Sequence, residues 1–172
     1  TMTPTGRPLF ATPSGKVEFW SDQLAAKGFD AVPKYTKHPE APPGSFRLIT
    51  GRAPGHTFSR TQTNPLLHDL MPENEIWVNA ATAARLGIRN REYVTLKNQD
   101  GVLSNRVRVK ATQRIREDTV YMVYGFGHSN KLMKTAYLMG ASAGQLNSSY
   151  RTDPIMGATS IHTNFVSLVK EA

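Results

Sequence analysis

The sequence contains no cysteine among its 172 residues. Disulfide bonds, thiolate metal ligands and cysteine nucleophiles are therefore excluded within this chain. No stretch approaches the roughly 20 consecutive apolar residues that a membrane-spanning helix needs, so we expect no direct insertion into a membrane. Residues 1–4 also lack the basic and apolar regions of a secretory signal.

Recognisable catalytic motifs are missing as well. The five histidines show no metal-ligand spacing such as His-x-x-x-His. Neither a nucleophile elbow, nor a phosphate-binding P-loop, nor a dinucleotide fingerprint occurs. We therefore do not expect this chain to turn over a substrate alone. Its 39% of hydrophobic and 20% of charged residues are typical of a folded globular domain.

Positive charge is in excess, with 21 Lys and Arg against 13 Asp and Glu, for a net charge of +8. Such an excess suits nucleic acid, an acidic protein surface or a phosphate-rich ligand, although an ordinary basic surface fits equally well. Arg106, Arg108 and Lys110 alternate and would share one strand face. Because neither a recognition helix nor a stacking motif accompanies them, we expect a solvated or docking face rather than bound nucleic acid.

Residues 1–45 differ in texture from the rest, since they hold most of the 11 prolines. Within them, residues 17–20 predict a short strand that leads into a helix ending at Gly28. Proline removes hydrogen-bond donors and restricts the residue before it, so the remainder should run extended. We interpret 1–45 as an N-terminal arm and 46–172 as the folded domain.

Short alternating segments dominate from residue 46 onward. They predict strands at 46–50, 75–79, 93–97, 101–109, 119–124 and 165–170. An Asp-Gly pair at residues 100–101 predicts a hairpin, and the alanine-rich residues 80–86 predict a helix that ends before Gly87. Many short strands with a few small helices indicate a mainly β fold, a closed or nearly closed barrel.

Several segments, taken in order, resemble the final domain of the dimethyl-sulfoxide-reductase family of molybdopterin oxidoreductases. They are the link 10–19 (FATPSGKVEF), the loop 48–61 with its Thr-Gly-Arg, the helix 78–88, residues 114–115, the glycine-rich 125–128, Asn147 and the closing valine-rich strand. The resemblance covers nearly the whole chain. The thiosulfate and polysulfide reductase branch is the most similar one.

This resemblance implies a double-psi β-barrel of the aspartate-decarboxylase-like kind. It implies bis(molybdopterin guanine dinucleotide) carrying molybdenum or tungsten, bound together with upstream domains of the same catalytic subunit. The implied reaction is the two-electron reduction of a sulfur oxyanion or polysulfide in anaerobic respiration. A periplasmic location is implied too, and iron–sulfur and membrane-anchor subunits are left open as partners. The alternative is a non-catalytic basic barrel that binds nucleic acid or a protein.

The resemblance also implies cofactor contacts, with no residue of this chain ligating the metal. Gly51 would let the backbone approach a pyrophosphate or pterin, Arg52 offers a fork for phosphate, and Phe58 could wall a planar ring. The full set of expected contacts is Thr50, Gly51, Arg52, His56, Phe58, Ser59, Arg60, Thr61, Asn79, His128, Asn147 and His162.

Two of these positions carry a second interpretation. Asn79 could read the edge of a guanine, or could cap the helix that follows it. His128 could face the cofactor, or could be a solvated loop residue. The chain also departs from the family pattern, because Thr82 stands where an acidic residue is common, while Ala80 and residues 117–118 replace prolines and a glycine. An acidic contact to guanine cannot be assumed here.

Overall fold

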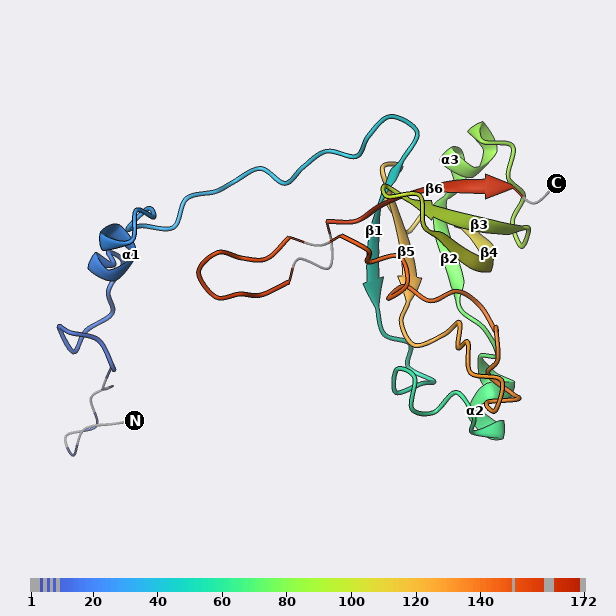
Figure 1. The fold of residues 1–172 in the computed structure, drawn as a ribbon, viewed down its shortest axis with the longest axis horizontal. Helices are drawn as coiled ribbons and strands as arrows, with labels where there is room; N and C mark the ends of the chain where they lie inside the picture. Colours follow the sequence, from blue (N-terminus) through green and yellow to red (C-terminus); the bar gives the residue numbers. More distant parts are fainter. Residues whose placement is uncertain are drawn as a thin grey trace. The chain divides into compact units, whose positions relative to one another are not determined.

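The computed structural model describes residues 4, 6, 8, 10–149, 151–159 and 163–170. The chain forms two compact units, Thr1–His38 and Pro39–Ala172. Figure 1 traces the chain through both units. In the described part of the chain, no helix is long and apolar enough to cross a membrane.

Among its described residues, the first unit contains one short helix, α1 (Asp22–Ala26). The hydroxyl of Ser21 caps it by accepting the Leu24 N–H at 3.3 Å, and Gly28 follows the helix with a φ of 79°. The predicted strand at residues 17–20 is wrong, because this segment is irregular and exposed. A strand needs a neighbour to satisfy its backbone, and no segment in the described part of the chain pairs with these residues.

The second unit is a closed six-stranded barrel, which confirms the expected mainly β fold. Its elements in chain order are β1 (Phe46–Gly51), α2 (Pro65–Leu70), β2 (Glu75–Asn79), α3 (Ala80–Arg85), β3 (Tyr93–Asn98), β4 (Leu103–Thr112), β5 (Thr119–Val123) and β6 (Phe165–Lys170). The strands neighbour one another in the order β1-β5-β2-β4-β3-β6, and β6 returns to β1. β1 pairs with β5 in parallel, as β2 does with β4, whereas the other pairs are antiparallel.

Alternation of side chains along the strands builds the barrel core. Successive strand residues point to opposite faces, so every second one enters the interior. The fully buried inward residues include Ile76, Val78, Val94, Leu96, Val107, Val109, Val120 and Met122. The predicted strands are therefore confirmed, with shifts of a few residues at their ends, since hydrophobic alternation fixes which face is inside.

The strand directions decide which loops meet. β1 and β5 run in parallel and β2 runs against β5, so the ends of β1 and β5 lie beside the start of β2. The loop after Gly51 and the loop after Val123 therefore leave the barrel at the same end, which is the end that carries α2 (Figure 1). The end of β2, followed by α3, lies at the opposite end.

Candidate cofactor-binding site

Gly51 ends β1 against the ring of a tyrosine. It pairs with Val123 across the parallel ladder, and a Cβ added to it would lie 2.9 Å from the Cε2 and Oη atoms of Tyr121. The Tyr121 hydroxyl donates to the carbonyl of Arg52 at 3.3 Å, and partial burial raises the pKa of Tyr121. The absence of a side chain at Gly51 is thus already required by packing within the protein.

His56 is a buried link within its own loop. Its Nε2 lies 2.9 Å from the carbonyl of Met71, which only accepts, so this nitrogen carries the proton. Its Nδ1 then accepts from the Thr61 hydroxyl at 3.1 Å, and that hydroxyl accepts the Thr57 N–H at 2.9 Å. The ring also meets Phe126 edge-on at 5.5 Å. The polar atoms of His56 are therefore engaged in holding the loop closed.

Arg52 and Phe58 stack on the surface of the same loop. The Arg52 guanidinium carbon lies 4.8 Å from the centre of the Phe58 ring, at cation–π distance. Phe58 has a φ of 50°, and its carbonyl accepts from the amide of Gln62, which is 2% exposed. Ser59 and Arg60 are exposed. Buried Gln62 was not anticipated, because a glutamine in a loop carries no sequence signal.

Two glycines let the neighbouring loops stack backbone on backbone. A Cβ on Gly125 would lie 2.3 Å from the carbonyl carbon of Phe58, and one on Gly127 would lie 2.4 Å from the nitrogen of Ser142. Both distances are shorter than any van der Waals contact, and both glycines have positive φ. The loop after β5 is therefore clamped between the loop after β1 and the segment that follows Gly140.

A hollow of about 420 Å³ opens where these three loops meet. Its lining includes Phe58, Ser59, His128, Ser129, Ser142 and Gly144, and among the described residues no aspartate or glutamate lines it. The Nε2 of His128 is buried and has no hydrogen-bond partner in the described part of the chain. Hydroxyls, a free imidazole nitrogen and no carboxylate form a donor set that fits an anionic, oxygen-rich ligand.

Asn74, which sequence reasoning missed, holds this end of the barrel together. It is fully buried and donates to the carbonyls of Val123 at 2.8 Å and Ala141 at 2.9 Å. Its Oδ1 accepts the Ala141 N–H at 2.9 Å, and a Cβ on Gly140 would fall 2.1 Å from that oxygen. A single asparagine before a strand resembles any turn residue, so no pattern in the sequence distinguishes it.

Asn79 lies at the opposite end of the barrel from this hollow. Its Oδ1 accepts the Ala81 N–H at 2.9 Å, which is the capping role considered for it, and its Nδ2 donates to the carbonyl of Ile115 at 2.8 Å. Nearby, the buried Thr82 hydroxyl donates to the carbonyl of Glu117 at 3.2 Å. Both polar atoms of Asn79 therefore serve the fold, and the structure does not bring it together with Arg52 or His128.

The remaining predicted contacts lie elsewhere again. Asn147 is half-buried beside the β3–β4 turn, where its Oδ1 accepts from the amide of Asn164. His162 lies outside the described residues. Thr50 is half-buried in β1, and its Oγ1 has no hydrogen-bond partner among the described residues. The loop residues 50–61 and His128 thus form one group, with Asn79 and Asn147 in two others.

The basic face of β4 is neutralised locally. The Nε of Arg108 lies 3.3 Å from a carboxylate oxygen of Glu75 and 3.5 Å from one of Glu73, as ion pairs without hydrogen-bond alignment. Lys110 lies 3.9 Å from Glu75 and 4.6 Å from the centre of the Trp77 ring. These cations line a separate hollow of about 580 Å³ together with their acidic partners. The face therefore presents little unpaired charge.

Arg106, the third cation of that strand face, packs on an aromatic ring. Its guanidinium carbon lies 4.8 Å from the centre of the Tyr93 ring. The hydroxyl of Tyr93 donates to Glu73 at 2.8 Å, and this hydrogen bond to a carboxylate raises the pKa of Tyr93. Glu73, which pairs with Arg108, therefore also accepts a hydrogen bond from the tyrosine on which Arg106 packs.

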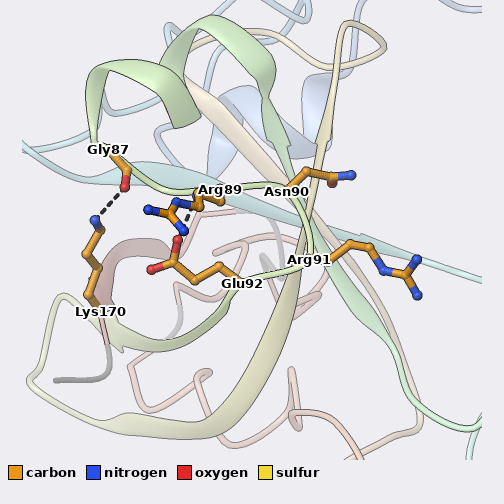
Figure 2. A pocket seen from close by; sticks show the side chains of 6 residues that line it. All are labelled: Gly87, Arg89, Asn90, Arg91, Glu92 and Lys170. Atoms are coloured by element: carbon orange, nitrogen blue, oxygen red, sulfur yellow. Dashed lines mark hydrogen bonds between the residues drawn. The ribbon is translucent and has the colours of Figure 1, made fainter.

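A third hollow, of about 400 Å³, lies beyond α3 (Figure 2). Lys170 donates to the carbonyl of Gly87, and Glu92 accepts the Arg89 N–H at 2.7 Å. Figure 2 shows the Arg91 side chain pointing away from Lys170 and Glu92. Since Arg91 points away and the carboxylate of Glu92 lies beside Arg89 and Lys170, this hollow does not converge on an anion.

Comparison with known proteins decides the family. Residues 46–166 match the family model described as the molydopterin dinucleotide binding domain. The chain belongs to this family. The resemblance inferred from the sequence is thereby confirmed, as are the barrel and the role as a cofactor-binding domain. The expected cofactor, bis(molybdopterin guanine dinucleotide) with molybdenum, follows from this membership.

Individual relatives are consistent with the family match. The chain is 33% identical over 161 residues to the thiosulfate reductase molybdopterin-containing subunit PhsA of Salmonella typhimurium, covering 92% of this chain and 21% of that protein. It is 23% identical over 176 residues to dopamine dehydroxylase of Eggerthella lenta, covering 95% of this chain and 17% of that protein. The chain thus spans about a fifth of the length of these relatives.

A solved structure shares the fold. Acetylene hydratase from Pelobacter acetylenicus aligns with a TM-score of 0.78 at 19% identity, covering 98% of this chain and 25% of that one. At this identity the likeness shows the fold alone.

Proposed function

We propose that this chain is the cofactor-binding barrel of a larger molybdenum oxidoreductase, in which it holds the molybdopterin guanine dinucleotides together with upstream domains of the same subunit. The observation that carries the proposal is the family match over residues 46–166, combined with a hollow in the same barrel whose described lining contains no aspartate or glutamate. The relatives, which are about five times longer, support a role as one part of a bigger subunit.

The reaction proposed for the whole enzyme is the two-electron reduction of a sulfur oxyanion or polysulfide. Its support is the 33% identity to a thiosulfate reductase subunit. Iron–sulfur and membrane-anchor partner subunits, a periplasmic location and a part in anaerobic respiration belong to the same proposal, with tungsten as the alternative to molybdenum. We expect no turnover from this chain alone, because the family places the metal-ligating residue in upstream domains.

The residues around the hollow would bind and orient the cofactor. The bound cofactor supplies the redox chemistry through its metal, and the protein supplies position and electrostatics. The hydroxyls of Ser59, Ser129 and Ser142 would donate to phosphate or pterin oxygens, and the free Nε2 of His128 would complete the set. Arg52, which stacks on Phe58 but lines the neighbouring hollow of about 580 Å³, would add a positive charge nearby.

An NMR titration with GMP and GDP tests this function. GMP carries one phosphate and GDP two, so their comparison separates recognition of guanine from recognition of pyrophosphate. We expect shifts at Gly51, Ser59 and His128, and none with the matching adenine nucleotides. The absence of shifts at millimolar nucleotide, or diffuse shifts along β4, would contradict the site.

The rival function, a basic barrel that binds nucleic acid, has weak support in the structure. Arg108 and Lys110 are paired with Glu75, and Arg106 packs on Tyr93. A face neutralised in this way releases few counterions from DNA. We expect little affinity for duplex DNA and a shallow dependence on salt. A steep fall in DNA affinity with rising salt would instead favour the rival.

A further inference from the structure

The side-chain amides of Gln99, Asn164 and Asn147 form a relay of hydrogen bonds, and a backbone N–H at one end fixes which atom of each amide donates and which accepts. The Phe165 N–H can only donate, so the Gln99 oxygen that lies 2.9 Å from it must accept. The Gln99 Nε2 then donates to the Oδ1 of Asn164 at 2.9 Å, and it also lies 3.4 Å from a carboxylate oxygen of Asp100. Because the NH₂ group of Gln99 faces two acceptors and its oxygen faces an N–H donor, this side chain has only one orientation that satisfies all three contacts.

The orientation of the Gln99 amide also determines the orientations of the Asn164 and Asn147 amides. Asn164 is 0% exposed, and its backbone carbonyl accepts the Leu48 N–H at 2.9 Å, so the residue is held in place. Because its Oδ1 is taken by Gln99, its Nδ2 must point the other way, where it donates to the Oδ1 of Asn147. The carbonyl of Asn147 is thereby used, and its Nδ2 has no acceptor among the described residues.

The backbone beside Asn147 is clamped independently. Asn98, which is 4% exposed, donates from its Nδ2 to the carbonyl of Leu146 at 2.9 Å. On the other side, Asp100 accepts from the hydroxyl of Ser148 at 2.6 Å. Asn147 is therefore held by its neighbours in the chain as well as by the relay, while its side chain stays half-buried.

We propose that Gln99 and Asn164 are positioning residues that lock the Asn147 amide with its NH₂ group outward, so that this position recognises an acceptor oxygen of the bound ligand. An unrestrained asparagine offers both a donor and an acceptor and can satisfy either. The relay removes the acceptor and leaves two donors. The ligand oxygen, a phosphate oxygen or a guanine carbonyl of the dinucleotide, rests on the function proposed above, whereas the relay itself does not.

The substitution Asn164→Asp is designed to reverse Asn147 alone. Aspartate has nearly the same shape, and one of its oxygens still accepts from Gln99. When this aspartate is ionised, its other oxygen cannot donate to Asn147, so Asn147 must rotate and donate its own NH₂ inward. The outward group then becomes a carbonyl, which repels an acceptor oxygen. Asn105→Asp, on β4 away from the relay, makes the same change in charge and serves as the control.

The first measurement is the exchange of side-chain amide protons with water in the ligand-free wild-type chain. We expect both Asn147 NH₂ protons to exchange rapidly, and the inward protons of Gln99 and Asn164 to be protected. Protection of an Asn147 proton would overturn the relay whatever the protein binds. Because no ligand is present, this result does not depend on the proposed function.

The second measurement adds guanosine, inorganic pyrophosphate or GDP. We expect the Asn147 NH₂ signals to shift and their exchange to slow with pyrophosphate if a phosphate oxygen is the partner, or with guanosine if a carbonyl is. GDP affinity should fall about tenfold in Asn164→Asp and in Asn147→Ala, but not in Asn105→Asp. Shifts at Ser59 and His128 with an unchanged Asn147 would refute the inference and leave the proposed function standing.

Discussion

At the scale of single residues, Asn74 ties together the segments at the end of the barrel that carries the acid-poor hollow. It makes three hydrogen bonds to backbone groups of Val123 and Ala141 in a fully buried setting. Asn74→Ala would leave three buried backbone groups without partners, at about 1–3 kcal/mol each when none can rearrange. We expect the free energy of unfolding to fall by roughly 3 kcal/mol or more, measured by urea denaturation.

Asn64→Ala is a useful comparison for that measurement. Asn64 caps α2 by accepting the Leu67 N–H at 3.3 Å, and this helix has no buried residue. Losing a cap of this kind costs about 1 kcal/mol. An Asn74→Ala variant no less stable than Asn64→Ala would show that the buried contacts of Asn74 do not carry the predicted energy.

The glycine at position 125 makes a second prediction at this scale. Its φ is 92°, and a Cβ would lie 2.3 Å from the carbonyl carbon of Phe58. Gly157 has a φ of 70° but open space around it. We expect Gly125→Ala to lower the free energy of unfolding by about 3 kcal/mol or more, and Gly157→Ala by only about 1 kcal/mol. Equal losses in thermal or urea unfolding would contradict the close approach.

A charged pair before β5 predicts how the protein responds to acid. The Arg116 guanidinium contacts both carboxylate oxygens of Asp118, at 3.0 and 2.9 Å, and the Thr119 hydroxyl donates to the same carboxylate. The Arg116 hydrogen bonds, with that of Thr119, lower the pKa of Asp118 from 3.8 to about 2. Because the pKa of Asp118 is lower in the folded protein than in the unfolded chain, the charged carboxylate stabilises the fold at any pH above about 4. This contribution disappears as the pH falls from about 4 to 2.

The measurement is a titration of the Asp118 side-chain carboxyl carbon by NMR. We expect its midpoint at about pH 2 in the wild type. In Arg116→Gln the midpoint should return toward 3.8, because the guanidinium is the largest cause of the shift. The effect on stability should be small, since the Asp118 side chain is 60% exposed and solvent screens the pair. A wild-type midpoint near 3.8 would rule out the pair in solution.

At the scale of elements, the alternation of apolar and polar residues predicted the barrel strands. β2 and β6 were found at the expected residues, and Gly101, with a φ of 85°, closes the expected β3–β4 hairpin. A period of two identifies a strand with one buried face, whatever its partner is. The prediction of a strand at residues 17–20 was wrong because a local pattern cannot show whether another strand lies beside it to pair with.

Helix α2 was missed although its start signals are present. Asn64 caps it and Pro65 takes its first position, both favourable at a helix start. Its six residues are too few to show a helical period, and nothing in it is buried. The structural roles of His56 and Asn74 were not predicted either. Both side chains bond backbone groups that are distant in the sequence, and such contacts leave no local pattern.

The arrangement of the site was the least predictable feature. The resemblance grouped Asn79 with the loop at residues 50–61, but β2 runs against β5 and carries Asn79 to the opposite end. Strand direction is set by which strands pair, and pairing in a barrel joins residues far apart in the sequence. Reasoning from the sequence could propose which residues matter, but not which of them meet.

At the scale of the whole molecule, the barrel should fold without residues 1–38. Its main core is drawn entirely from residues 46–166, from Phe46 to Val166. Because hydrophobic burial is the chief stabilising term, a domain that keeps its core keeps most of its stability. We expect a chain of residues 39–172 to retain the amide shifts of β2 and β4 and a cooperative unfolding transition. Loss of either would show that the barrel requires the first unit.

The closure of the barrel is uneven around its circumference. β1 shares five paired residues with β5, but only two with β6, at Phe46–Val166 and Arg47–Phe165. Together with the β2–β5 junction, which also has two paired residues, this junction is one of the two seams at which the barrel can open at the lowest cost. A seam that opens turns two interior strands into free edges, and free edges recruit other strands. We therefore expect exchange of segments or aggregation under mild stress to begin at such seams, and the β1–β6 seam lies beside Asn164 of the amide relay.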